Sequence, residues 1–139
     1  MRWIYKARCI VQEYRKNCQE LHELEARMQG PSVSVQVSIM SSKISKPVEA
    51  AVEQLALQER KRYLELAVNA VELATEAVLK KPQGSVTVRL VDMLYYQGTH
   101  TLSGVAQALD ISEPTAKRYH RFFLKMVALH MGYLSLSEN

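Results

Sequence analysis

The side chains with the clearest chemistry lie near the C-terminal end of the chain. Lys117, Arg118 and Arg121 fall on one side of a predicted helix, with Thr115 beside them. Lysine and arginine can donate hydrogen bonds to phosphate oxygens or to O6 and N7 of guanine, and threonine can contact a phosphate or a thymine methyl group. This chemistry suits binding to duplex DNA; the alternative is an ordinary solvated helix face. The candidate DNA-binding residues are Ser112, Glu113, Thr115, Lys117, Arg118 and Arg121.

The elements that must position these residues are predicted within the segment Thr101–His120, as a short helix, a tight turn and a second helix. Ala106, in the first helix, is small enough for a steep crossing of two helices. Asp110 tolerates the left-handed conformation that ends such a helix, and Ile111 is the apolar side chain of the turn. The apolar face of the first helix consists of Leu102, Val105, Ala106 and Leu109. This is the pattern of a helix-turn-helix, whose second helix enters the DNA major groove.

The second helix has two candidate starting points. Ser112 is a favourable N-cap, but Pro114 disfavours helical geometry at the residue before it, so the cap is either Ser112 or Glu113. Further along, His120 and Lys125 are expected to lie near the DNA backbone if they contact DNA at all. The inward stripe of this helix is predicted to be Ala116, Tyr119, Phe122, Phe123, Met126, Val127 and Leu129.

The rest of the chain is also predicted to be helical, over residues 2–29, 47–81 and 85–97, with the charged run 59–62 as an alternative break in the second of these helices. In the first helix, apolar residues at alternating three- and four-residue steps form a seam suited to packing against another helix, in the same chain or in a second copy. The seam residues expected to serve oligomerisation or partner binding are Ile4, Val11, Tyr14 and Leu21. Residues 32–46 alternate apolar and polar side chains, which favours either a disordered linker or a segment that pairs with its counterpart in a dimer.

Together these elements predict an all-α fold, with long N-terminal helices followed by a C-terminal tri-helical helix-turn-helix domain. The predicted organisation is an N-terminal helical or oligomerisation region at residues 1–83, including a linker at residues 30–46. A DNA-binding domain follows at residues 84–134, and the helix over residues 85–97 supports it.

Composition limits the class of protein. The chain has 139 residues and a formal net charge of +4, a modest basic bias that permits nucleic-acid binding. No apolar run approaches the roughly 18 residues that cross a bilayer, and charges interrupt the N-terminus too often for a signal peptide. Cys9 and Cys18 lack metal or redox spacing and are expected to be reduced. Without a phosphate-binding glycine loop or a catalytic cluster, we expect no enzyme, metal, cofactor or small-molecule substrate.

Four segments that span nearly the whole chain are YKARCIVQEYRKNCQELHELEARMQGP, SSKISKPVEAAVEQL, VDMLYYQGTHTLSGVAQALDISEPTAKRYH and FFLKMVALHMGYL. Their order and spacing resemble the RinA/ArpU-type phage late-gene transcription regulator family. The resemblance implies a C-terminal helix-turn-helix similar to region four of bacterial sigma factors, in an activator of phage packaging and structural genes. The residues that match the recognition helix of that family are Glu113, Thr115, Lys117, Arg118 and Arg121. The sequence departs from the family in the linker SVSVQVSIM and at Asp110, where many such motifs place glycine.

We therefore expect a sequence-specific DNA-binding transcription regulator, an activator of phage or prophage late genes. Its expected partners are double-stranded DNA, host RNA polymerase and a second copy in a homodimer, in the bacterial host cytoplasm at the nucleoid and without a membrane partner. One alternative is a phage DNA-packaging recognition subunit of the small-terminase type. Another is a helical module that binds polymerase or another partner and has lost DNA binding. Mass in solution and affinity for DNA separate these three functions.

Overall fold

The computed structural model describes residues 2–28, 45–98 and 100–135. These residues form helices joined by turns, with no strand among them, which confirms the all-α prediction. The predicted linker lies outside the described residues, except for Ser45 and Lys46, which begin a helix. The chain divides into two compact units, one made of residues 1–15 and 67–139 and the other of residues 16–66. The first unit includes residues on both sides of the predicted boundary between residues 83 and 84. That boundary, between an oligomerisation region and a DNA-binding domain, therefore stays a prediction.

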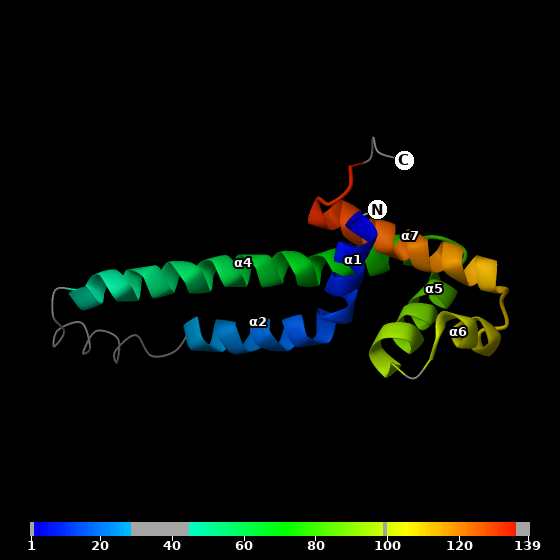
Figure 1. Cartoon of the computed structure of the whole chain (residues 1–139), viewed down its shortest axis with the longest axis horizontal. Helices are drawn as coiled ribbons and strands as arrows, with labels where there is room; N and C mark the ends of the chain where they lie inside the picture. The colour runs from blue at the N-terminus through cyan, green and yellow to red at the C-terminus, as the bar shows by residue number, and fades with distance from the viewer. Residues whose placement is uncertain (1, 29–44, 99, 136–139) are drawn as a thin grey trace. The chain divides into compact units, whose positions relative to one another are not determined.

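The first unit is organised around α7 (Glu113–Met131), the helix that carries the candidate DNA-binding residues. It contacts α1 (Arg2–Gln12), α5 (Gly84–Val91) and α6 (Leu102–Ala108) (Figure 1). The largest fully buried side chains of the unit include Val11, Val78, Leu90, Val105, Phe123, Leu124 and Val127. These residues come from α1, α5, α6, α7 and the end of α4 (Ser45–Leu79), so a single core fixes how α7 is rotated about its axis.

The predicted helix over residues 2–29 is wrong in one respect, because it divides at Glu13. α1 ends at Gln12, and α2 (Tyr14–Met28) begins directly afterwards. α1 buries Ala7, Ile10 and Val11 in the core of the first unit. No proline or glycine marks the division, which is why the apolar spacing predicted one continuous helix.

The second unit joins α2 to the first part of α4 (Ser45–Leu79), which is one helix with no break at its charged run. Arg60, in that run, donates to both carboxylate oxygens of Glu20 on α2, at 2.6 and 2.8 Å. These hydrogen bonds hold the pKa of the Glu20 carboxyl below its usual value. The charged run therefore joins two helices instead of ending one.

The predicted helix over residues 85–97 consists of α5 and a wider π-helical segment, η1 (Asp92–Gln97). Gly98 ends it with φ of +67°, a left-handed conformation that glycine adopts without strain. Within η1, the Tyr95 side chain is directed towards His120 of α7, and the Tyr96 ring lies 6.0 Å from the Tyr14 ring. Consecutive tyrosines thus hold η1 against α7 and against Tyr14, the first residue of α2.

The turn between α6 and α7 has the local geometry that the sequence predicted. Asp110 has φ of +57°, and the Ile111 amide donates to the carbonyl oxygen of Ala106 at 3.0 Å. Ser112 is the cap, because its side chain accepts a hydrogen bond from the Thr115 amide at 3.2 Å and helix α7 begins at the next residue. The choice between the two predicted caps is therefore settled in favour of Ser112.

Gly84 generates a testable prediction, because it lies where α4 and α5 approach each other. A Cβ atom at this position would overlap the Val78 carbonyl oxygen and lie 2.6 Å from the Leu79 Cα. Backbone atoms cannot move aside cheaply, so we expect Gly84→Ala to lower the free energy of unfolding by about 2–3 kcal/mol. Urea unfolding followed by the fluorescence of Trp3, in the same unit, measures this change.

Gly104→Ala is the matched control, since Gly104 lies in α6 and an added Cβ would come no closer than 3.4 Å to the Thr101 Oγ1. Alanine has the higher helix propensity, so this variant should gain up to about 1 kcal/mol. Equal effects of the two substitutions would contradict the close approach at Gly84.

Candidate nucleic-acid interface

All six candidate DNA-binding residues lie in the N-terminal half of α7 or at its cap. Five of them are exposed and Thr115 is half-buried; the exposed residues are Ser112, Glu113, Lys117, Arg118 and Arg121. The opposite side of the helix is buried through Ala116, His120, Phe123, Leu124, Val127 and Ala128. α7 therefore has one side in the core and one polar side rich in basic groups, and its amino end, where the helix dipole favours anions, lies among the exposed residues.

A short-range polar network holds these side chains in place. The Ser112 hydroxyl donates to the Thr115 Oγ1 at 2.8 Å, and the Arg118 guanidinium donates to the same oxygen at 3.3 Å. The Lys117 ammonium lies 3.9 Å from the Glu113 carboxylate, one helical turn away. An exposed pair of this kind contributes only about 0.3–0.5 kcal/mol. The Lys117 ammonium could therefore leave Glu113 and bind an anion instead with little loss of free energy.

Arg121 is positioned by a residue that the sequence did not single out. Its guanidinium lies over the ring of Trp3, 5.4 Å from the centroid, and Trp3 is half-buried on α1. A cation held on an aromatic face loses less conformational entropy when it then binds a ligand. No periodic signal links positions so far apart in the chain, and only the packing of α1 against α7 brings these two residues together.

His120 lies in the interior, so the prediction that it approaches the DNA backbone is wrong. Its Nε2 is 2.6 Å from the Tyr95 hydroxyl, and burial lowers the pKa of His120 to about 4, with the nearby Arg8 charge acting in the same direction. Burial also raises the pKa of Tyr95 to about 12, against the opposing effect of Arg8. A neutral imidazole with its proton on Nδ1 can accept a hydrogen bond from the Tyr95 hydroxyl at Nε2. The pair thus joins η1 to α7 as two uncharged, hydrogen-bonded groups.

The inward stripe of α7 is consequently displaced from the predicted one. Ala116, Phe123 and Val127 are buried as expected, and the predicted residues Tyr119, Phe122, Met126 and Leu129 are half-buried and packed against the core. The most buried positions also include three residues that the prediction missed, His120, Leu124 and Ala128. The signal was present, because Ala116, His120, Phe123 and Val127 recur at steps of four, three and four residues. The polar character of histidine hides His120 in that series.

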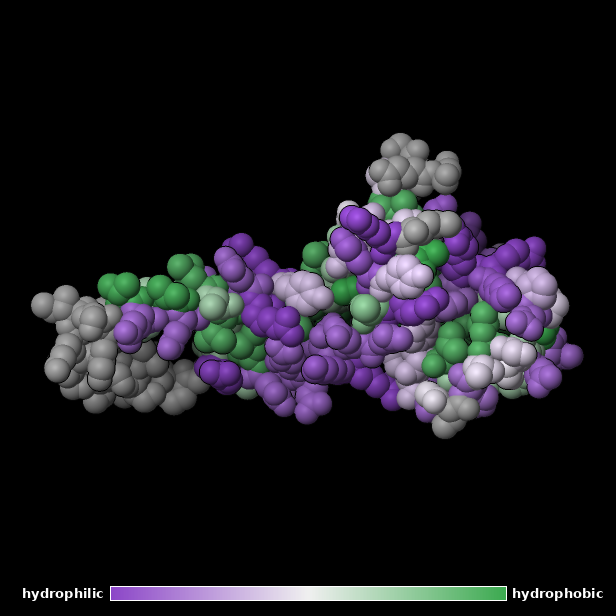
Figure 2. Space-filling view, in the orientation of Figure 1, coloured by the Kyte–Doolittle hydropathy of each residue, from purple (hydrophilic) through white to green (hydrophobic). Residues whose placement is uncertain are grey.

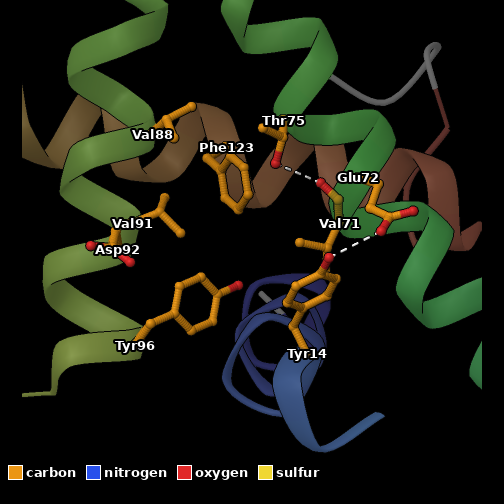
Figure 3. Close-up of a pocket in the computed structure, with 9 residues that line it drawn as sticks. All are labelled: Tyr14, Val71, Glu72, Thr75, Val88, Val91, Asp92, Tyr96 and Phe123. Carbon is orange, nitrogen blue, oxygen red and sulfur yellow. Dashed lines mark hydrogen bonds between the residues drawn. The ribbon is translucent and has the colours of Figure 1, made fainter. Parts of the chain in front are cut away.

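A separate pocket of about 270 Å³ opens on the first unit, with apolar walls that include Val71, Val88 and Phe123 (Figure 3). Glu72 and Asp92 contribute carboxylates to its lining, and the Tyr14 hydroxyl donates to Glu72 at 3.0 Å. Two carboxylates repel a polyanion such as DNA. This pocket is therefore unsuited to nucleic acid, unlike the exposed side of α7.

The predicted partner seam lies largely within the chain's own packing. Val11 is fully buried in the core of the first unit, and Ile4 and Tyr14 are packed against that core. Leu21, in the second unit, is half-buried. The sequence predicts packing of this seam either within the same chain or against a second copy. Val11 packs within its own chain.

No protein-family model, curated protein or solved structure gives a significant match to this chain. Within the part of the chain that the structure describes, no helix has the length and apolar character needed to cross a membrane. In that same part, no three histidine, cysteine or acidic residues come together as metal ligands.

The Tyr95–His120 pair predicts a loss of stability in mild acid. His120 has a folded-state pKa of about 4, below its value of about 6.5 in an unfolded chain, so between these pH values only the unfolded chain takes up the proton. Stability is retained above pH 6.5 and should fall by about 2–3 kcal/mol as the pH is lowered to 4. Urea unfolding midpoints from pH 7 to pH 4, followed by Trp3 fluorescence, measure the decline.

His120→Gln removes this titration and should flatten the pH dependence, even if it lowers stability at neutral pH. His130→Gln is the control, because His130 is exposed at the end of α7 and its replacement should leave the decline in place. An equal decline in the wild type and in His120→Gln would show that burial of His120 is not its cause.

Proposed function

We propose that this protein is a sequence-specific DNA-binding transcription regulator, in which α6, the turn and α7 form a helix-turn-helix. The observation that supports the proposal is that α7 has one basic, exposed side and one buried side. Its exposed side gathers Lys117, Arg118 and Arg121 beside a capped N-terminus, while its opposite side is fixed in the core. A recognition helix requires both features, because base contacts depend on a helix held at a fixed rotation.

The basic side chains would supply most of the affinity. Each lysine or arginine that neutralises a phosphate releases a counterion, so binding should weaken steeply with salt. The exposed Ser112 hydroxyl and the Glu113 amide would contact the sugar-phosphate backbone and set the register of the helix in the groove. These contacts orient the protein and carry no sequence information of their own.

Sequence discrimination would come from a smaller set of side chains. Lys117 or Arg118 can bond O6 and N7 of guanine, and the Glu113 carboxylate can accept from N4 of cytosine. Glu113 would be repelled by phosphate, so a carboxylate at this position lowers non-specific affinity while permitting one base contact. An acidic residue at the start of a basic helix is therefore better suited to selecting a sequence than to electrostatic attachment alone.

The resemblance to phage late-gene regulators extends the proposal to the activation of phage or prophage genes by a homodimer that contacts host RNA polymerase. Two recognition helices related by a two-fold axis would favour half-sites about 34 Å apart, or a multiple of that spacing. The modest excess of basic residues over the whole chain agrees with binding that is local to α7.

The test compares Lys117→Ala and Arg121→Ala with the wild type on two duplexes, one from the DNA flanking the protein's own gene and one of the same composition in scrambled order. If either residue contacts a base, its loss should weaken binding to the native duplex by about 1–3 kcal/mol and reduce the preference over the scrambled one. A phosphate contact would weaken both duplexes alike and lower the salt slope by about one. Fluorescence anisotropy at low and physiological salt measures both effects.

Lys81→Ala is the matched control, since it removes the same charge from an exposed site outside α7. A contrary outcome is that the wild type prefers the native duplex while Lys117→Ala and Arg121→Ala bind it with the same affinity as Lys81→Ala. In that case α7 is not the recognition helix. Absence of DNA binding at both salt concentrations would favour a partner-binding module in place of a regulator.

A further inference from the structure

The first part of α4 presents apolar side chains on two opposite faces. On one face Leu64 is buried and Leu57 is half-buried, within the second unit. The other face is exposed, with exposed fractions of 65% for Val48, 60% for Val52, 60% for Leu55 and 46% for Leu66. Figure 2 shows hydrophobic side chains gathered over the beginning of α4. Single exposed apolar residues need no explanation, but several of them on one face of a helix indicate a docking surface.

The spacing of this row is that of a coiled-coil seam. Its members recur at alternating steps of four and three residues, and they are Val48, Val52, Leu55, Glu59, Arg62 and Leu66. We call this row the α4 strip. Glu59 and Arg62 interrupt the apolar residues, both are exposed, and neither takes part in an ion pair with any residue that the structure describes. The strip thus carries one acid and one base at its middle.

We propose that the α4 strip binds the same strip of a second copy of this chain, with the two α4 helices antiparallel. In one register Glu59 lies opposite Arg62 of the second copy, and Leu55 lies opposite Leu66 of the second copy. Two-fold symmetry makes each contact twice, so the strip is complementary to itself. The inference refines the homodimer of the proposed function and does not depend on its DNA binding.

Charge selects this arrangement over its competitors. In a parallel pair, Glu59 would meet its own copy and Arg62 would do the same, which places like charges together at two levels of the seam. Moving the antiparallel register by one heptad in either direction sets Arg62 opposite Val52 or Leu66, where its charge would be buried without a partner. An unrelated protein would have no reason to match the order of acid and base on this strip.

A charge exchange tests the pairing in the full chain without DNA. Sedimentation equilibrium should show the wild type at twice the 15.8 kDa chain mass at micromolar concentration. Glu59→Arg and Arg62→Glu each create like-charge contacts, and each should weaken dimerisation by about tenfold or more. The double variant Glu59→Arg/Arg62→Glu restores opposite charges and should return to within about threefold of the wild type. Circular dichroism checks that the helices persist.

A monomeric wild type overturns the proposal, whether the strip is then covered by the chain itself or awaits a different protein. Single variants that dimerise like the wild type, a double variant without rescue, or a larger ring unaffected by the exchange also overturn it. A monomer that still prefers its native duplex would leave the proposed DNA-binding function standing.

Disulfide cross-linking tests orientation, after Cys9 and Cys18, which are both free thiols, are changed to serine. A mixture of Leu55→Cys chains and Leu66→Cys chains should cross-link under mild oxidation, because the two positions face each other across the antiparallel pair. Each variant alone should cross-link at least tenfold less. Gln54→Cys, exposed on a neighbouring face, is the control. Efficient cross-linking of Leu55→Cys alone would indicate a parallel pair and overturn the proposal.

Discussion

The structure of the first unit depends on the packing of the buried side of α7. This helix contacts α1, α5 and α6, and the residues that make those contacts determine which of its side chains reach solvent. The uncharged Tyr95–His120 hydrogen bond joins α7 to η1. This bond restricts rotation of the helix, because a rotated helix would leave the buried His120 imidazole without its Tyr95 partner. The orientation of Lys117 and Arg121 towards solvent is a consequence.

The ends of the helices add to this constraint. Asp110 adopts a left-handed backbone conformation in the turn between α6 and α7, and the Ser112 side chain then accepts a hydrogen bond from the Thr115 amide. The Asp110 conformation and the Ser112 cap depend on neighbouring residues only, and they determine where α7 begins. The core determines how α7 is rotated about its axis. Trp3, on a helix from the other end of the chain, holds the guanidinium of Arg121. Position, rotation and side-chain orientation therefore come from three different parts of the sequence.

This division explains what could be predicted from the sequence. The turn and cap depend on neighbouring residue types, so the conformation of Asp110 and a cap at Ser112 or Glu113 followed from local chemistry. The helical state of the chain followed from apolar periodicity. The burial of His120 did not, because a histidine is polar until a partner such as Tyr95, distant in sequence, satisfies it. The division at Glu13 and the Trp3–Arg121 contact likewise depend on packing between segments that periodicity treats separately.

The limited size of a single DNA-binding module connects the proposed DNA binding with the proposed dimer. Small modules bury only about 600–1,000 Å² of protein surface on DNA, so one copy of α7 by itself would bind with limited affinity at physiological salt. Joining two such modules makes the second binding event intramolecular, and the apparent affinity can rise by roughly 10²–10⁴ without any new contact to DNA. The exposed α4 strip offers a means of joining two copies that leaves the exposed side of α7 uncommitted, because the two surfaces share no residue. Pairing through one helix and recognition through another would let the protein gain affinity for a two-fold symmetric site without adding basic residues, and added basic residues would strengthen non-specific binding equally.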